Sequence, residues 1–262
     1  MTSTPKNDNS TRSRLIEALE LLLVLLVAAI VRGIYLFNHP LETRDGILYI
    51  EFIRDWFARG DAAIPEFLQT QPPLYCYLSR ILMYCNLSAE ASSLSVNFAA
   101  GILLIIPIYF SGKLLFGGKK PGLQLALLAA VMPVLIKYSC IRLREGLYFF
   151  FLFVTFNFLL HTLWGKRESI CAFLCGLFAT TALLARYEAL EMLLFCGGGI
   201  FLCGFFPQVR WKKILLLTGI FLLGVLAGIA VIKLLPGLPD ITIIFINRIK
   251  AQWLGTSLNP IK

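Results

Sequence analysis

Long apolar runs, separated by short charged clusters, make up most of this 262-residue chain. Most of these runs are close to the roughly 20 residues that a helix needs to cross the hydrocarbon core of a bilayer. The pattern predicts seven membrane-spanning helices. They are expected at residues 15–37, 94–116, 123–141, 146–164, 170–185, 189–206 and 214–235. We therefore predict an all-α, multi-pass transmembrane helical bundle.

The stretch between the first two predicted spans, residues 38–93, has a different pattern. From Gly46 to Arg59 apolar side chains recur at helical spacing on one side and charged side chains fall on the other, which is typical of an amphipathic helix. Such a helix lies along a membrane interface. Pro72 and Pro73 precede a second apolar helix, Leu74 to Tyr84, that is too short to cross. We predict two juxtamembrane helices in this first outer loop.

Asp45 comes directly before the predicted amphipathic helix. A carboxylate at that position can cap free backbone N–H groups and is stabilised by the helix dipole. Capping of this helix is therefore the structural interpretation of Asp45.

The composition agrees with a membrane protein. With 58% hydrophobic residues and a mean hydropathy of +0.78, the chain is too apolar for an ordinary soluble domain. The net charge of +9 is compatible with nucleic-acid binding. However, the basic residues form short clusters between apolar runs rather than one stripe, so we predict no nucleic-acid partner.

The charged clusters predict an orientation. If the amino terminus is cytoplasmic and residues 74–84 do not cross, the basic clusters at 119–120, 166–167 and 210–213 all face the cytoplasm. This is the arrangement that the positive-inside rule requires. The mixed clusters at 142–145 and 186–191 then lie on the outer side, together with the acidic first loop.

These assignments divide the chain into three parts. They are a cytoplasmic tail at 1–14, a transmembrane module at 15–235 and an outer segment at 236–262. A cleaved signal peptide is the alternative to the first span. Because Arg32 follows the apolar core where a small-residue cleavage site would be expected, we favour an uncleaved anchor.

The cysteines and histidines give no metal-binding pattern. The seven cysteines contain no C-x-x-C pair and lie mostly within apolar runs, so we interpret them as small core residues. Cys76 and Cys85, both near the outer surface, form the one plausible disulfide. His39 and His161 have no ligand partners at metal spacing, so we predict no protein-held zinc site.

Two charged clusters on the predicted outer side suggest a binding site for a phosphate group. Arg142, Arg144 and Glu145 precede an aromatic run. Guanidinium groups bind phosphate, and an aromatic wall suits the tail of an amphiphilic phosphate. Alternatively, the two arginines reach lipid headgroups while Glu145 pairs with one of them. Arg186 and Glu188 form a similar cluster of arginine and glutamate, which is a second candidate for phosphate binding. The alternative is an interfacial turn that holds local ion pairs.

Four segments together resemble the GT-C superfamily of membrane glycosyltransferases. They read TRDGILYIEFIRDW, QPPLYCYL, IRLREGLYFF and LLARYEALEML. The resemblance is to the family 39 type, which includes protein O-mannosyltransferases and lipid A aminoarabinose transferases. It covers residues 15 to about 235 and corresponds to the amino-terminal module of that superfamily, which has seven spans and two juxtamembrane helices.

The resemblance implies a hexosyl- or pentosyltransferase in the cell inner membrane, which moves a sugar from a polyprenyl-phosphate donor to a lipid, glycan or protein acceptor on the outer face. Asp45 would be the catalytic base, and arginines would hold the leaving phosphate. The candidate phosphate-binding residues are Arg142, Arg144 and Arg186. The supporting acidic residues are Glu42, Glu51, Glu145 and Glu188. A divalent metal is the one cofactor left open, and the expected partners are the donor, the bilayer and a second membrane subunit.

The chain departs from the family pattern at two positions near these candidate residues. Gly46 follows Asp45 where the family often has two adjacent acidic residues, and Gln71 stands where a histidine often precedes the two prolines. Two other functions share the same features: a transporter or flippase for lipid-linked glycans, and a non-catalytic membrane subunit of a glycosyltransferase complex.

Overall fold

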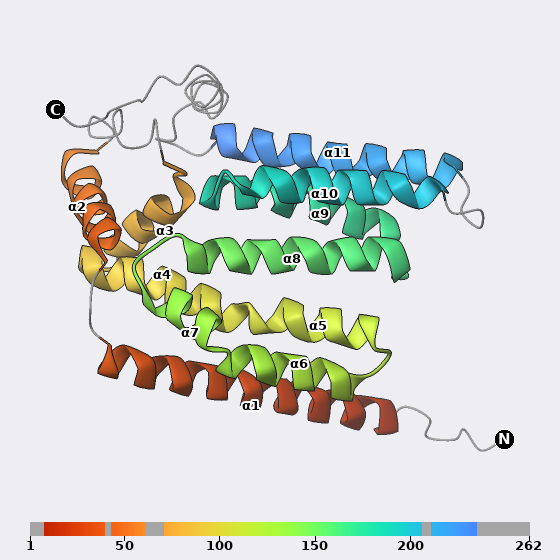
Figure 1. Ribbon diagram of the computed structural model, residues 1–262, viewed down its shortest axis with the longest axis horizontal. Helices are drawn as coiled ribbons and strands as arrows, with labels where there is room; N and C mark the ends of the chain where they lie inside the picture. The colour runs from red at the N-terminus through yellow and green to blue at the C-terminus, as the bar shows by residue number, and fades with distance from the viewer. Residues whose placement is uncertain (1–7, 40–42, 61–70, 206–210, 235–262) are drawn as a thin grey trace.

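The computed structural model describes residues 8–39, 43–60, 71–205 and 211–234, and every regular element in these ranges is a helix (Figure 1). The longer helices run roughly parallel to one another along the long axis of the molecule. The elements are α1 Asp8–Asn38, α2 Arg44–Arg59, α3 Leu74–Met83, α4 Ala89–Leu103, α5 Ile105–Leu115, α6 Lys119–Val131, α7 Pro133–Cys140, α8 Glu145–Trp164, α9 Glu168–Ala185, α10 Ala189–Leu202, the 3-10 turn η2 Cys203–Phe205 and α11 Trp211–Leu234.

Four segments among the described residues are long and apolar enough to cross a membrane: α4 with α5 (Ala89–Leu115), α8, α9 and α11. The bent pair α6 and α7 is a candidate fifth. The chain is thus an all-helical protein with four or five candidate membrane-spanning segments, and seven spans remain a prediction. The segment Ala189–Phe205 is a shorter apolar helix.

The predicted boundaries shift at two helices. The first span was expected to follow a tail at 1–14, but α1 already begins at Asp8. The second span was expected from residue 94, but α4 begins at Ala89 because Ser88 caps it, its hydroxyl accepting from the backbone N–H of Ala91 at 3.2 Å. The outer segment 236–262 lies outside the described residues.

The span predicted at 123–141 is interrupted, because the chain breaks between α6 and α7 with a bend of 56°, and the bent pair stays a candidate span. Pro133 has no backbone N–H, and the residue before a proline is pushed out of the helical region. Met132 accordingly has an extended backbone, with φ −67° and ψ 119°. The break re-aims α7 toward the loop that joins it to α8.

Arg32 of α1 supports this break from inside the bundle. The residue is fully buried, at 0% exposure. Its Nη1 donates to the carbonyl of Ala130 at 3.0 Å, and its Nε donates to the hydroxyl of Ser139 at 3.2 Å. Because the backbone leaves the helix at Met132, the Ala130 carbonyl lacks the regular helical donor and the guanidinium replaces it. The sequence indicated only that Arg32 marks an uncleaved anchor.

The two short helices predicted in residues 38–93 are present as α2 and α3, and they lie at the end of the bundle opposite the amino terminus of α1 (Figure 1). Their juxtamembrane position stays a prediction. They pack on one another and on α4, and α3 also contacts α9. Trp56 and Tyr75, both fully buried, are at the centre of this packing. The structure thus holds α2 by its apolar face, as the amphipathic pattern predicts.

The opposite end of the bundle carries the basic clusters. The turns from α5 to α6 and from α8 to α9 lie at the same end as the start of α1 (Figure 1). Ion pairs link helices there: Glu17 of α1 with Lys113 of α5, Glu20 of α1 with Lys119 of α6 at 3.0 Å, and Glu168 of α9 with Lys213 of α11 at 2.5 Å. The basic clusters therefore lie at the end of the bundle opposite α2 and α3.

The one disulfide that the sequence left plausible, between Cys76 and Cys85, is not formed. All seven cysteines are free. Cys76 is buried in the first turn of α3, whereas Cys85 is exposed just beyond the end of that helix. The two thiols lie at opposite ends of one rigid helix of 10 residues, about 15 Å long, which is too long for a disulfide to bridge.

Replacement of Arg32 by lysine tests the support of the break. Arg32→Lys keeps the charge, but a single ammonium group cannot reproduce the fork that reaches both Ala130 and Ser139. We expect a loss of about 1–3 kcal/mol of stability, because buried acceptors lose their donor. The midpoint of thermal unfolding in detergent should fall by roughly 4 °C or more. Arg14→Lys, at an exposed position of α1, is the control; equal midpoints for both variants would contradict this role.

Candidate functional site

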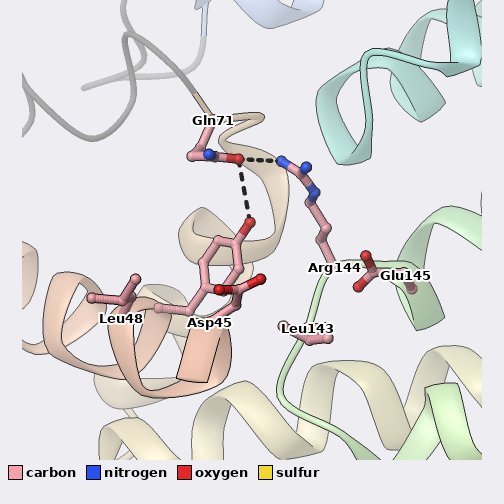
Figure 2. A pocket seen from close by; sticks show the side chains of 7 residues that line it. Asp45, Leu48, Gln71, Leu143, Arg144 and Glu145 are labelled. Carbon is pink, nitrogen blue, oxygen red and sulfur yellow. Dashed lines mark hydrogen bonds between the residues drawn. The ribbon is translucent and has the colours of Figure 1, made fainter. Parts of the chain in front are cut away.

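Three stretches that are distant in the sequence meet around one cavity of about 160 Å³ beside α2 (Figure 2). The first is the amino-terminal half of α2, the second is the residue before the two prolines, and the third is the junction of α7 and α8. The lining residues are Asp45, Leu48, Tyr49, Gln71, Leu143, Arg144 and Glu145. The predicted base, one predicted phosphate-binding arginine and one supporting acidic residue are therefore brought together.

Asp45 lies in the first turn of α2 but does not cap it. The helix begins at Arg44, and the cap is Thr43, whose hydroxyl accepts from the backbone N–H of Gly46 at 3.0 Å. The capping interpretation of Asp45 is thus wrong, since Thr43 already fills the N-cap position. The exposed Asp45 carboxylate is left to line the cavity.

Gly46 lets the start of α2 rest directly on the loop between α7 and α8. A Cβ atom at this position would lie 3.3 Å from the backbone oxygen of Arg142 and 3.0 Å from the hydroxyl of Thr43. Both contacts are tighter than ordinary van der Waals distances. A side chain at position 46 would require Thr43 or the loop to shift by a few tenths of an ångström.

Arg144 reaches across the cavity to Gln71. Its Nη1 donates to the side-chain oxygen of Gln71, and the hydroxyl of Tyr49 donates to the same oxygen at 3.5 Å (Figure 2). Burial raises the pKa of Tyr49, partly offset by the nearby charge of Arg144, so its phenol stays protonated and remains a donor. Gln71 thus holds the guanidinium over the cavity through a neutral acceptor.

Glu145 and Arg186 form the wall behind Arg144. Glu145 Oε1 lies 3.5 Å from Nη1 of Arg186, and its buried Oε2 has no hydrogen-bond partner among the described residues. The guanidinium of Arg186 lies 5.7 Å from the ring centre of Tyr148 and donates to Glu188 at 3.1 Å. Arg186 does not line the cavity; it is held beside it by local ion pairs.

The carboxylate of Glu188 is stabilised at this wall. Burial acts to raise its pKa, but hydrogen bonding to its own backbone N–H and the charge of Arg186 outweigh burial, so the net shift is downward. Glu188 therefore stays ionised and keeps Arg186 in its ion pair at neutral pH.

The remaining predicted residues lie elsewhere. Arg142 does not line the cavity: its Nε donates to the backbone oxygen of Glu90 at 3.0 Å and so ties the loop to α4. The carboxylate of Glu90 in turn pairs with Arg54 of α2. Glu51 is exposed on α2 and is not part of the lining. Glu42 lies outside the described residues.

The alternative in which Glu145 pairs with Arg142 or Arg144 does not match the ion pairs described, since Glu145 pairs with Arg186. Among the residues that the structure describes, no group of three or more His, Cys, Asp or Glu side chains could hold a metal ion. Asp45 and Glu145 are the two carboxylate residues that line the cavity. A divalent metal stays open, as it was from the sequence.

Sequence reasoning missed Tyr49, Gln71 and Asn97. Tyr49 falls on the apolar side of the amphipathic pattern from Gly46 to Arg59, and Gln71 was noted only as a departure from a family pattern. Asn97 is a fully buried amide on α4 that bonds to the loop carrying Arg144. An isolated amide within an apolar helix is a signal that could have indicated it, because polar groups at membrane depth are costly unless they are used.

A second hollow lies between the candidate membrane-spanning helices. It measures about 530 Å³ and lies between α5, α8 and α9. Its walls are largely apolar and include Phe150, Phe158 and Phe178, with His161 at its far end. Phe150 is five residues beyond Glu145, or about 7.5 Å along the axis of α8. Phe150 is thus about one and a half turns of α8 from Glu145, which lines the polar cavity.

Comparison with known proteins gives no further assignment: no protein-family model matches this chain, and no curated protein sequence matches it.

Substitution of Thr43 tests which residue caps α2. Thr43→Ala should weaken the amino end of the helix by about 1 kcal/mol, because the Gly46 N–H loses its acceptor. We expect the exchange of the Gly46 amide hydrogen to become roughly fivefold faster. Thr43→Ser keeps the hydroxyl and should leave the rate near that of the parent. Faster exchange in Asp45→Ala than in Thr43→Ala would mean that Asp45 is the cap after all.

Proposed function

We propose that this chain is a membrane glycosyltransferase that transfers a sugar from a polyprenyl-phosphate donor to an acceptor at the outer face of the membrane. The observation that supports this most is the convergence of Asp45, Arg144 and Glu145 on one cavity. Nearly 100 residues separate Asp45 from Arg144. A carboxylate opposite a guanidinium is the pair that sugar transfer from a phosphate leaving group requires.

Asp45 is the proposed general base. The acceptor hydroxyl oxygen attacks the anomeric carbon of the sugar, the bond from that carbon to the phosphate oxygen breaks, and the hydroxyl proton passes to the Asp45 carboxylate. The products are the glycosylated acceptor and the polyprenyl phosphate. Because Asp45 is exposed at the edge of the cavity, an acceptor can approach it from the aqueous side.

Arg144 is the proposed phosphate-binding residue. Negative charge on the phosphate grows as the glycosidic bond breaks, and a positioned guanidinium stabilises that charge more in the transition state than in the bound donor. Glu145 and Arg186 stand behind it as a positioning pair. In this proposal Gln71 gives up its contact with Arg144 when the phosphate arrives.

The apolar hollow favours a donor with a lipid tail. It lies between α5, α8 and α9 and has aromatic and aliphatic walls, and its Phe150 is about one and a half turns of α8 from Glu145. A polyprenyl chain could leave the phosphate site and enter this hollow from the bilayer. Such sideways access suits a substrate that never leaves the membrane.

The distribution of charge supports the proposed orientation in a cell inner membrane. Basic residues such as Lys119, Lys166 and Lys213 gather at the end where α1 begins, which the positive-inside rule places in the cytoplasm. The cavity then lies at the outer face. We propose that α1, the bent pair α6 and α7, and α10 complete a seven-span topology.

The proposed base is tested by Asp45→Asn in purified protein that is supplied with radiolabelled polyprenyl-phosphate sugar. Removing the proton acceptor should lower the release of polyprenyl phosphate by roughly 10²-fold or more, with expression unchanged. Asp55→Asn, on the same helix and outside the cavity lining, should retain parent activity. Full turnover in Asp45→Asn would exclude Asp45 as the base.

The same assay separates the other functions. A flippase would move labelled lipid across liposomes without releasing polyprenyl phosphate. A non-catalytic subunit would show no turnover alone and would co-purify with a second membrane protein. Either result would refute the proposed activity of the chain itself.

Substitution of the two arginines of the loop, Arg144 and Arg142, should reduce activity to different extents. Arg144→Gln should lower kcat/KM roughly 10²-fold, because it removes a charge-bearing donor from the cavity. Arg142→Gln removes a contact with Glu90 outside the cavity and should cost less than about tenfold. Equal losses, or a larger loss for Arg142→Gln, would mean that Arg142 is the phosphate-binding residue.

A further inference from the structure

The loop that carries Arg144 has a bond partner on a different helix. Asn97 of α4 is fully buried, and its side-chain Nδ2 donates to two carbonyls of the loop. The acceptors are the oxygen of Ile141, at 2.7 Å, and the oxygen of Leu143. Its Oδ1 accepts from the backbone N–H of Leu147 at 3.2 Å. One amide thus uses three hydrogen bonds on a single seven-residue segment.

These three bonds satisfy the ends of two helices. Ile141 is the C-cap residue of α7, and Leu147 is the third residue of α8. The N-cap residue of α8 is Arg144, whose own side chain makes no capping bond. The backbone groups at helix ends otherwise have no intrahelical partner. Asn97 therefore caps α8 from another helix and holds the end of α7 at the same time.

The fit around Asn97 is close. A Cβ atom on Gly146 would lie 3.0 Å from Asn97 Oδ1 and 2.7 Å from the backbone oxygen of Tyr138. Only a residue without a side chain lets α8 approach the amide to this distance. The segment is thereby fixed against α4 on both sides of Arg144.

We propose that Asn97 is a positioning residue for the candidate site: it sets where the Arg144 guanidinium and the Glu145 carboxylate stand in the cavity, without touching a substrate itself. The catalytic part of this inference rests on the proposed glycosyltransferase function, whereas the structural part does not. A displacement of about 1 Å in a positioned group can cost roughly 10²-fold in rate.

Two variants separate the donor and acceptor roles of the amide. Asn97→Ala removes all three bonds. Asn97→Asp keeps the shape and the acceptor for Leu147 but loses both donors to the loop carbonyls. Ser92→Ala is the matched control, because Ser92 lies on the same helix, is fully buried and its hydroxyl has no hydrogen-bond partner in the described part of the chain.

The first measurement is amide hydrogen exchange over residues 141–148, which needs no substrate. We expect exchange to be roughly tenfold or more faster at Leu147 in Asn97→Ala. In Asn97→Asp protection at Leu147 should be largely kept. Ser92→Ala should match the parent protein. Unchanged exchange in Asn97→Ala, in folded protein, would overturn the inference.

The second measurement is the release of polyprenyl phosphate. In Asn97→Ala kcat should fall roughly 10- to 100-fold while KM changes less than about threefold, because the misplaced guanidinium matters most when the leaving charge develops. Parent-like kcat in a variant whose loop has opened would overturn the positioning role. A parent protein that releases no product, with a loop that still opens in Asn97→Ala, would refute the proposed function alone.

Discussion

In a membrane-embedded bundle every backbone N–H and C=O that leaves a regular helix must find a partner within the protein, because lipid supplies none. This constraint bears on two of the places where the helices are interrupted. At the break before Pro133, Arg32 donates to the carbonyl of Ala130. At the junction of α7 and α8, Asn97 bonds to Ile141 and Leu143. Both donors come from other helices, α1 and α4.

The two interruptions are linked, because α7 lies between them and is only eight residues long. Arg32 fixes its beginning through Ala130 and its last turn through Ser139. Asn97 then fixes the residue that follows it. The loop bearing Arg144 is thus held by contacts made well inside the bundle, whereas α2 reaches the same loop from outside through Gly46. The cavity forms where these two supports meet.

Much of the fold could be predicted from the sequence, because hydrophobic periodicity and proline positions are local signals. They indicated an all-helical membrane protein and gave α2 and α3 within two residues of their observed bounds. The local pattern did not show that Pro133 would interrupt its span at Met132, because the sequence is apolar on both sides of this position. It also assigned the cap of α2 to Asp45, because Thr43 and Asp45 are both good N-cap residues and only the backbone geometry distinguishes them.

The candidate site was predicted less completely, for a physical reason. The cluster of Arg142, Arg144 and Glu145 could be recognised as charged residues at the end of a span, but neighbouring side chains in a loop point in different directions. Arg142 turns toward Glu90, whereas Arg144 faces Gln71. Residues whose part depends on a distant partner, such as Asn97 and Gln71, carry little local signal beyond polarity.

The contact between Gln71 and Arg144 sets a selectivity threshold for anything that enters the cavity. The carboxamide oxygen of Gln71 accepts from both Arg144 and Tyr49, so both of its lone pairs are engaged. A ligand that enters the cavity can accept from the same Nη1 of Arg144 only if it displaces the neutral oxygen of Gln71. Charge-assisted hydrogen bonds are roughly twice as strong as neutral ones, so an anion can win that exchange. A free alcohol or an uncharged glycolipid forms no charge-assisted hydrogen bond of this kind with Arg144. The same amide therefore favours anionic ligands over neutral ones.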